Sequence, residues 1–436
     1  MAEIRAFRGF RYDLGRVGRL SDVIAPPYDV VDAGLQQQLY DSSAYNVIRL
    51  ELTRDDPEST VDKYSTAART LHGWLNDDIV KQDTTRMIYV LEQEFEIEGT
   101  TFVRRGFLAR VRLEPLGTGT IFAHEQTMAG PKADRLKLFQ ATGFNLSPVF
   151  GIYPDEAGSL FARIEPLIRN APPITAVDHL GVINRLWPIP ETGVISHLVG
   201  GMGPKSITIA DGHHRYETGL KYLAEQQAAG NVNDPDSPAN FTLMMLVGMS
   251  DPGLVILPTH RLLSGLAGVT AAGLRSALSP YFTIVGEFGA DAAACWEHVQ
   301  LEESQSVLGF GVPADGAAAA EWFAVKLTDD TILAKLAPDR SAEWRALAVS
   351  ILQKLVIEQI LPRNFGTSPT AAYVHLLKEV TDATESNACQ VACLVPAVSM
   401  DHVEFIAGNR ETMPPKSTYL YPKLPTGLVF HSLKKD

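Results

Sequence analysis

The chain has 436 residues, of which 45% are hydrophobic and 20% are charged, and its formal net charge is −13. This length predicts two or three domains with large cores, and the composition excludes a disordered chain. The acidic balance argues against a nucleic-acid partner, because binding a polyanion requires a basic surface that releases counterions.

The three cysteines, Cys295, Cys389 and Cys393, do not form a disulfide framework, and we expect them to be reduced and buried. The first residues lack the apolar segment of a secretion signal, and no apolar run approaches the ~18 residues of a membrane span. These features predict a cytoplasmic protein with no membrane contact.

The first part of the chain predicts alternating strands and helices. Its apolar periodicity indicates strands at residues 4–12, 45–52, 86–96 and 101–113, and helices at residues 32–40 and 60–75. Glu98-Gly99 between the last two strands is a hairpin signal. Pro26 and Pro27 stiffen a loop before Tyr28 and Asp29, which is either a plain turn or a functional loop.

A dense polar segment follows from His124 to Arg135 and leads into a helix predicted to start near residue 131 or 132. Lys132 and Arg135 are three residues apart, so they share one helical face and suit an anion clamp, with Thr127 as a further phosphate ligand. His124 and Glu125 form a candidate acid–base pair. The alternative is a charged helix start stabilised by salt bridges.

The segment from Ser206 to Tyr222 contains the turn Asp211-Gly-His-His-Arg215, which is the main candidate site in the sequence. A buried strand is predicted before it, and a helix is predicted from about His213 to Ala229. Such a strand–turn–helix presents backbone amides and the positive end of a helix dipole to an anion.

The side chains of this turn add chemistry to its backbone. Asp211 is a plausible N-cap, and Gly212 allows the backbone to approach a ligand closely. Arg215 supplies a planar fork for phosphate, whereas His213 and His214 can carry protons near neutral pH. The alternative is an ordinary structural turn.

Two further segments repeat parts of this pattern. Residues 254–261 predict a strand that ends in His260 and Arg261, and ligands bind at such strand ends in open α/β sheets. Near the C-terminus, Lys416 is followed by the hydroxyls of Ser417 and Thr418 on a proline-stiffened loop. This loop is either a phosphate site or a docking tail.

A continuous amphipathic helix is predicted from Ser341 to Leu361.

The whole pattern predicts an α/β protein (an α+β mixed sheet) with two domains. The N-terminal α/β domain covers residues 1–264 and contains His124–Arg135 and Asp211–Arg215. The C-terminal α/β domain covers residues 265–436 and ends in Met413–Thr418.

Several of these segments resemble a known family of unknown function. Phe-Arg-Gly near the start, Ile-Ala-Pro-Pro-Tyr-Asp, His-Glu-x-Thr with Lys-x-Asp-Arg, Ile-Ala-Asp-Gly-His-His-Arg-Tyr and Met-Pro-x-Lys-Ser-Thr are similar to the bacterial and archaeal DUF1015 family. The resemblance covers nearly the whole chain and implies kinship, but almost nothing about function.

The Asp211–Arg215 turn also resembles the phosphate-binding turn of the ParB/sulfiredoxin fold, which includes free-serine kinases. This resemblance implies a ParB/sulfiredoxin-like core with large insertions, in which Asp211, Gly212, His213, His214 and Arg215 form the phosphate and phosphoryl-transfer site. Sulfiredoxin has a reactive Cys in this turn, whereas this chain has His213 there, so thiol chemistry is not expected.

Our leading hypothesis is a nucleotide-dependent phosphoryl-transfer enzyme that acts on a small hydroxylated metabolite such as serine, with ATP or ADP and Mg²⁺. Glu125 or Asp211 would be the general base, and a histidine would shuttle protons. The alternatives are a non-catalytic nucleotide-binding regulator and a metal-dependent hydrolase. The hydrolase would use His124, His213, His214 and His260. The sequence leaves the acceptor, the nucleotide base and the oligomeric state open.

Overall fold

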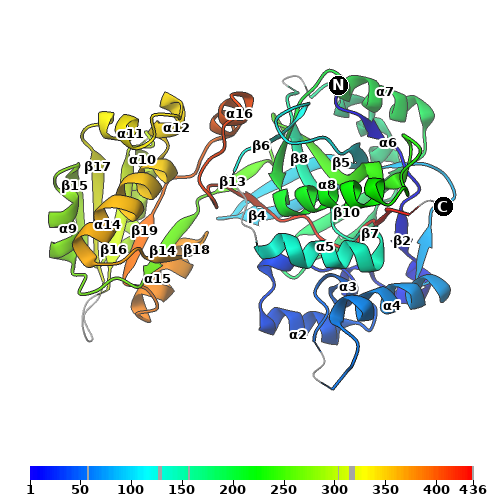
Figure 1. Ribbon diagram of the computed structural model, residues 1–436, viewed down its shortest axis with the longest axis horizontal. Helices are drawn as coiled ribbons and strands as arrows, with labels where there is room; N and C mark the ends of the chain where they lie inside the picture. The colour runs from blue at the N-terminus through cyan, green and yellow to red at the C-terminus, as the bar shows by residue number, and fades with distance from the viewer. Residues whose placement is uncertain (56–57, 126–129, 156–157, 303, 314–319, 435–436) are drawn as a thin grey trace. The chain divides into compact units, whose positions relative to one another are not determined.

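The computed structural model describes residues 1–55, 58–125, 130–155, 158–302, 304–313 and 320–434, and its elements are labelled in Figure 1. The chain forms two compact units. The first unit comprises Met1–Ala123, Thr127–Val255 and Pro422–Asp436, and the second comprises His124–Gln126 and Ile256–Tyr421. No helix among the described residues is both long and apolar enough to cross a bilayer.

The first unit is built on a nine-stranded mixed sheet with the order β6-β11-β8-β12-β5-β4-β10-β9, in which β1 also pairs with β5. The pairs β6–β11 and β8–β12 are parallel, whereas the other pairs are antiparallel. The strands are β1 (Ile4–Arg5), β4 (Ile88–Ile97), β5 (Thr100–Arg112), β6 (Ile121–Ala123), β8 (Val149–Tyr153), β9 (Ile174–Val177), β10 (Ile183–Ile189), β11 (Ile207–Asp211) and β12 (Phe241–Gly248).

Local sequence explains the sheet's main hairpin and its central strand. Glu98 and Gly99 both have positive φ, 49° and 78°, as a two-residue turn between twisted strands requires. The strand β12 is buried from Phe241 to Val247, because it lies inside the sheet and both of its faces are covered. The predicted hairpin is confirmed.

Helices α6 (Glu165–Asn170), α7 (Thr192–Met202) and α8 (His213–Ala228) contribute to the apolar core on one face of this sheet. Leu198 of α7 and Tyr216 of α8 pack there with Val111 and Met244. Helix α5 (Gly130–Thr142) packs against α8 and against α4 (Lys63–Asn76). The remaining elements of the unit are α1 (Leu14–Val17), α2 (Ala33–Ser42), α3 (Ile48–Glu51), β2 (Phe10–Tyr12), β3 (Val80–Gln82), β7 (Phe144–Asn145) and β21 (His431–Ser432).

The second unit has a six-stranded antiparallel sheet with the order β15-β17-β16-β19-β14-β18. Its strands are β14 (His260–Ser264), β15 (Phe282–Gly289), β16 (Val307–Val312), β17 (Glu321–Leu327), β18 (Thr370–Val374) and β19 (Val391–Leu394). A separate pair joins β13 (Val255–Leu257) to β20 (Tyr419–Tyr421). Cys295, Cys389 and Cys393 are buried as free thiols, as the sequence predicts.

The helices of the second unit include α9 (Ala271–Leu278), α10 (Ala292–Leu301), α11 (Thr331–Leu336), α15 (Leu377–Glu385) and α16 (Met400–Gly408). The continuous helix predicted from Ser341 to Leu361 is wrong, because the segment is divided. It forms α12 (Ala342–Ala346), α13 (Ala348–Ile351), a π-helix η5 (Leu352–Ile360) and α14 (Leu361–Phe365). Pro362 lies two residues after the end of the π-helix, within a continuous helical stretch, so it does not end the helix.

Two other differences concern the chain's organisation. The segment predicted as a strand at residues 45–52 contains helix α3, because the Asn46 side chain accepts a hydrogen bond from the Ile48 N–H and starts a helical turn. The division between the units falls at Val255 rather than at residue 264, and the last fifteen residues belong to the first unit. The local composition of the last fifteen residues does not indicate that they belong to the first unit.

Candidate functional site

The turn after β11 is held by ion pairs on a single carboxylate. Asp211 ends the strand, and its Oδ2 accepts a hydrogen bond from Arg215 Nη2 at 2.9 Å. Its Oδ1 accepts one from Lys423 Nζ at 2.6 Å. The Asp211 side chain is only 18% exposed, so both pairs are largely shielded from solvent.

These two cations decide the protonation of Asp211. Burial raises the pKa of the Asp211 carboxyl, but Lys423 and then Arg215 lower it further, and the net pKa lies well below its usual range. A general base is most effective when its pKa lies near the working pH. The predicted role of Asp211 as general base is therefore disfavoured, and its role here is to anchor two cations.

Gly212 is the N-cap of α8, and Asp211, the predicted N-cap, is instead the last residue of the strand. Gly212 has φ of 83°, and a Cβ at this position would lie 2.9 Å from the Arg215 guanidinium. Glycine therefore meets both a backbone requirement and a packing requirement. Because it has no side chain, it cannot cap the first amides of the helix.

The three side chains after Gly212 differ in placement. His213 is buried, and its charge contributes to lowering the Asp211 pKa, which places it close to that carboxylate. His214 is partly exposed. Arg215 is 4% exposed and also donates to the Pro148 carbonyl oxygen, so it points inward. Arg215 thus positions the turn, in contrast to its predicted role as a direct phosphate ligand.

Sequence reasoning missed two cationic residues at this turn. One is Lys423, because nothing in its local sequence links it to Asp211. Arg104, on β5, is fully buried and donates from Nη2 to Gln93 Oε1 and to the Pro422 carbonyl oxygen, each at 2.5 Å. Since Pro422 precedes Lys423, Arg104 holds the segment that places Lys423 on Asp211.

Burial explains the electrostatic state of Arg104. It lowers the pKa of the Arg104 guanidinium to about 9, and the negative charges of Asp251 and Asp211 oppose this shift. The guanidinium also lies over the Phe150 ring, 4.8 Å from its centroid. The first unit therefore gathers three cationic side chains, Arg104, Arg215 and Lys423, around Asp211.

Arg135 forms a second polar cluster in the first unit. Its Nη1 donates to the Glu51 carbonyl oxygen at 2.8 Å, and its Nε donates to Asp134 Oδ2 at 2.9 Å. The guanidinium lies over the Tyr28 ring, 4.1 Å from its centroid. Arg135 is 3% exposed, so it stabilises the packing of α5 on the N-terminal helices rather than presenting a surface clamp.

This second cluster is connected to the first one. The charges of Arg215 and Arg135 both act on Tyr28, whose pKa is raised to about 12, chiefly by burial. Ser147 donates to Glu51 Oε1 at 3.0 Å, and the next residue, Pro148, accepts from Arg215. Tyr28 and Ser147 are thus further members of the polar network that the sequence analysis did not assign.

Lys132 does not join Arg135 in a clamp. Its Nζ pairs with Glu217 Oε2 of α8 at 2.5 Å. This contact favours the alternative of a helix start stabilised by salt bridges. Thr127, the other predicted phosphate ligand in this segment, lies outside the described residues.

The second unit brings the His124 segment and the Met413–Thr418 loop together. His124 Nε2 lies 2.6 Å from Thr418 Oγ1, and the His124 carbonyl oxygen accepts from the Met413 N–H at 2.8 Å. Glu125 forms a parallel bridge with Met413. Two motifs almost 300 residues apart therefore meet, with His124 fully buried between them.

Arg261 supports the same loop from β14. It is 3% exposed, and its Nη2 donates to the Lys416 carbonyl oxygen at 2.9 Å. Ser417 Oγ donates to the Pro414 carbonyl oxygen at 2.7 Å. Burial lowers the pKa of the Arg261 guanidinium to about 10. Arg261 and Ser417 therefore fix the loop and leave Lys416 as its partly exposed cation.

Lys416 itself has a φ of 57°, in the left-handed region that non-glycine residues rarely adopt. The neighbouring Pro414 and Pro415 border a cavity of about 330 Å³, which is within the range of small-molecule sites. Its other lining residues include Arg340, Trp344 and Lys354. Lys416 is not among the residues that line this cavity.

His260 does not belong to this loop's polar contacts. It is fully buried, its Nδ1 accepts from the Val395 N–H at 3.2 Å, and its ring packs edge-on against Trp296. Burial, with the charges of Arg261 and His375, lowers the pKa of His260 to about 3. A neutral imidazole in the core is a poor anion ligand, so the predicted phosphate contact of His260 is disfavoured.

A metal site is not assembled by these residues. Within the described parts of the chain, no group of three or more His, Cys, Asp or Glu side chains is arranged to hold a metal ion. Both oxygens of Asp211 already accept from side-chain cations, so Mg²⁺ would have to compete with Lys423 and Arg215 there. Asp211 does not fit the single carboxylate that a Mg²⁺–nucleotide site requires.

Comparisons with solved structures return proteins of low identity. A conserved hypothetical protein from Pyrococcus furiosus is 12% identical, with 72% of this chain and 92% of that chain covered and a TM-score of 0.34. A free serine kinase in complex with AMP is 11% identical (74% and 98% covered, TM-score 0.35). SbnI with a C-terminal truncation, from Staphylococcus aureus, is 10% identical (76% and 90% covered, TM-score 0.34).

No curated protein matches the sequence. A family model described as "Protein of unknown function (DUF1015)" matches residues 4–350, which confirms the resemblance drawn from the sequence motifs. The matched range includes His124–Arg135 and Asp211–Arg215 and ends before Met413–Thr418 and Lys423. The chain therefore belongs to the DUF1015 family.

Proposed function

We propose that the first unit binds the phosphates of a nucleotide at the Asp211–Arg215 turn, and that the protein transfers a phosphoryl group between this nucleotide and a small hydroxylated metabolite. The observation that supports this most is the N-terminus of α8. A sixteen-residue helix begins there at a glycine, beside a lysine that a buried carboxylate holds in place.

The physical argument begins with the helix. Its first amides and the positive end of its dipole attract an anion. Lys423 adds a full positive charge. Phosphoryl transfer depends largely on positioning and on charge stabilisation, which a preorganised cationic site supplies.

The cations of the turn divide into a binding residue and positioning residues. Lys423 is the binding residue of the proposal. Arg215 and Arg104 are positioning residues, because each donates to groups of the protein that hold the turn or the Lys423 segment. No step of the proposed reaction is routed through Mg²⁺, since Asp211 does not fit as its ligand.

The acid–base roles of the proposal stay within the first unit. Asp211 stays ionised, so it holds the two cations, and His213, which is buried close to the Asp211 carboxylate, is the preferred proton carrier. This assignment is tested by His213→Gln, which should lower turnover while nucleotide binding at the Asp211–Arg215 turn persists.

Binding is tested by thermal unfolding with AMP, ADP and ATP, on the wild type and on Lys423→Met. A ligand at 100 times its dissociation constant adds about 2.7 kcal/mol to the stability of the folded state, which gives a readily measured shift. Lys221→Met is the matched control, because Lys221 is an exposed lysine of helix α8, which begins at the turn. No shift with any nucleotide, or an equal shift in Lys423→Met, would refute the proposed site.

A second candidate function is favoured by the low pKa of Asp211. A carboxylate that remains ionised can hold Lys423 in place for a nucleotide without taking part in proton transfer. The protein would then be a non-catalytic nucleotide-binding regulator. Tight nucleotide binding with no phosphoryl transfer to a panel of small hydroxylated metabolites, serine included, would select this function over the enzyme.

A further inference from the structure

We propose that the first unit carries a second anion site, formed by Arg5, Arg110 and Arg112 around the ring of Phe241 and by Arg86 nearby, and that it binds a small dianionic phosphate compound. These four residues are called the arginine cluster below. The proposal does not depend on the proposed function, because it concerns different residues.

Arg110 is the centre of the arginine cluster. It lies on β5 and is 6% exposed, and its side chain has no hydrogen bond or ion pair with any described residue. Its Nε is fully buried, and its guanidinium lies 4.5 Å from the centroid of the Phe241 ring. A buried guanidinium without a carboxylate is costly unless an anion or water satisfies it.

The strand pairing places more positive charge beside Arg110. Arg5 of β1 is directly opposite Arg110 in the antiparallel register, an arrangement that is unfavourable for like charges. Arg112 follows two residues later on the same face of β5. The guanidinium carbons of Arg112 and Arg5 lie 4.5 and 5.5 Å from the same Phe241 centroid. Three arginines thus surround one ring.

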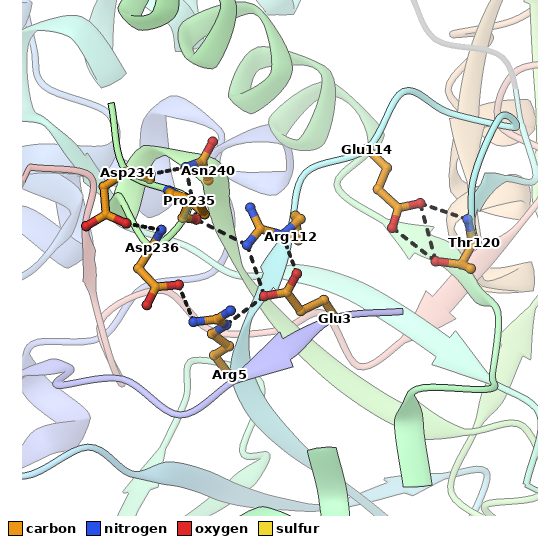
Figure 2. A network of polar contacts seen from close by, with 9 residues as sticks. All are labelled: Glu3, Arg5, Arg112, Glu114, Thr120, Asp234, Pro235, Asp236 and Asn240. Atoms are coloured by element: carbon orange, nitrogen blue, oxygen red, sulfur yellow. Dashed lines mark hydrogen bonds and ion pairs between the residues drawn. The ribbon is translucent and has the colours of Figure 1, made fainter. Parts of the chain in front are cut away.

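Nearby carboxylates neutralise only part of this charge. Figure 2 shows Arg5 and Arg112 converging on Glu3, with Arg5 also reaching Asp236. Arg86 is exposed, and its charge acts on Arg110 without an ion pair of its own in the described part of the chain.

The four arginines outnumber the carboxylates that act on them, Glu3, Asp236 and Glu114. Burial lowers the pKa of Arg110 to about 10, and Arg86, Arg5 and Arg112 lower it too, whereas Asp236 raises it. A phosphate monoester carries about −1.5 to −2 near neutral pH, so it brings more negative charge to these arginines than one carboxylate does. Guanidinium forks also fit phosphate oxygens in geometry.

The arginine cluster is separate from the Asp211–Arg215 turn. Arg104, which holds the Lys423 segment, and Arg110 lie on the same face of β5, six residues apart. At about 3.3 Å per residue, they are roughly 20 Å apart along the strand. A ligand at the arginine cluster therefore does not occupy the nucleotide site proposed above.

The neighbouring polypeptide also favours a formed site rather than a loose surface patch. The loop before β12 is fixed by hydrogen bonds from Arg112 to the Pro235 carbonyl oxygen and from Asn240 to the carbonyl oxygens of Asp234 and Pro235 (Figure 2). Arg112 therefore has little freedom to lose when an anion binds, which favours binding.

The test is calorimetric titration of the full chain with inorganic phosphate, methyl phosphate and acetate at low salt. We expect both phosphates to bind, and acetate to bind at least about tenfold more weakly. Arg110→Met should weaken phosphate binding at least about tenfold. Arg86→Ala should also weaken it, and this exposed residue can be replaced without loss of folding. Arg169→Ala, an exposed arginine of α6, should leave it unchanged.

Lys423→Met separates this proposal from the proposed function. If phosphate binding is lost in Lys423→Met and kept in Arg86→Ala and Arg110→Met, the phosphate occupies the nucleotide site and the arginine cluster is not an anion site. The proposal is also overturned if the wild type binds no phosphate, or if acetate binds as tightly as phosphate. Preferential binding of methyl phosphate over inorganic phosphate would identify the ligand as a phosphate ester.

Discussion

Lys423 donates a hydrogen bond to Asp211 at 2.6 Å, although the two residues are 212 positions apart in the chain. This bond ties the C-terminal segment to the turn that begins α8. Because Arg104 holds the carbonyl oxygen of the preceding residue, the position of the ammonium group is fixed from two sides. The C-terminal segment is therefore part of the candidate nucleotide site.

Removing Lys423 should destabilise the protein. In Lys423→Met, Asp211 keeps Arg215 as its partner but loses a largely buried cation, and breaking such a pair costs about 3 kcal/mol. Urea unfolding measures this loss. In a double-mutant cycle, Asp211→Asn should cost less in the Lys423→Met background than in the wild type, because the carboxylate has lost a partner. Additive effects would contradict the ion pair.

Gly212→Ala should destabilise the protein by about 1–2 kcal/mol or more, since an L-residue in the left-handed region costs that much and the added Cβ meets the Arg215 guanidinium. Gly200→Ala is the opposite control. Gly200 lies inside helix α7, and a Cβ there has no atom within 4 Å, so alanine should stabilise by about 0.5–1 kcal/mol. Thermal unfolding of the two variants measures whether each is less stable or more stable than the wild type.

The parts of the fold that the sequence predicts are those set by neighbouring residues. The hairpin at Glu98-Gly99 and helix α8 both follow from local rules of turn geometry and apolar periodicity. The strand predicted at residues 45–52 fails because Asn46 bonds to carbonyl groups 22 and 24 residues away, a contact that periodicity does not contain.

In the candidate site, too, only the features set by neighbouring residues could be predicted. The Asp211–Arg215 turn is recognisable in the sequence because its residues are adjacent in the chain. The contacts of its side chains could not be predicted, because Arg215 points inward to Pro148 and because Lys423 comes from the far end of the chain. The burial of His260 could not be predicted for a similar reason, because its contact with Trp296 depends on packing within the second unit.

Asp134 should make the stability of the folded protein depend on pH in the acidic range. Burial raises its pKa, but Arg135, Tyr64 and Lys63 lower it more, from 3.8 to about 2. Its contribution to stability is therefore complete above about pH 4 and is lost as the pH falls toward 2. The difference in unfolding free energy between the wild type and Asp134→Asn should shrink over that interval. A difference that is constant with pH would contradict the pKa assignment.

His260 should stay neutral throughout the physiological range. Its pKa is lowered from 6.5 to about 3, so the unfolded chain takes up a proton at this residue below about pH 6.5 while the folded chain does not. Folding stability should fall as the pH decreases from about 6.5 toward 3, and His260→Gln should remove that part of the decline. In NMR spectra the His260 ring signals should not shift between about pH 5 and pH 8.

Lys416 offers a test of whether backbone strain is kept for function. Its left-handed φ of 57° costs about 1–2 kcal/mol for a residue with a Cβ, whereas glycine adopts it freely. Glycine also raises the entropy of the unfolded chain, so Lys416→Gly should leave stability unchanged or raise it by up to about 1 kcal/mol.

If the Lys416 side chain contacts a ligand, Lys416→Gly should at the same time weaken binding or turnover. Lys416→Asn separates the two effects, because asparagine tolerates the left-handed conformation and lacks the positive charge. Full function in both variants would mean that the lysine has no role in the site and that the strain is set by the turn alone. Loss of function in both, with stability retained, would assign the charge of Lys416 to ligand binding.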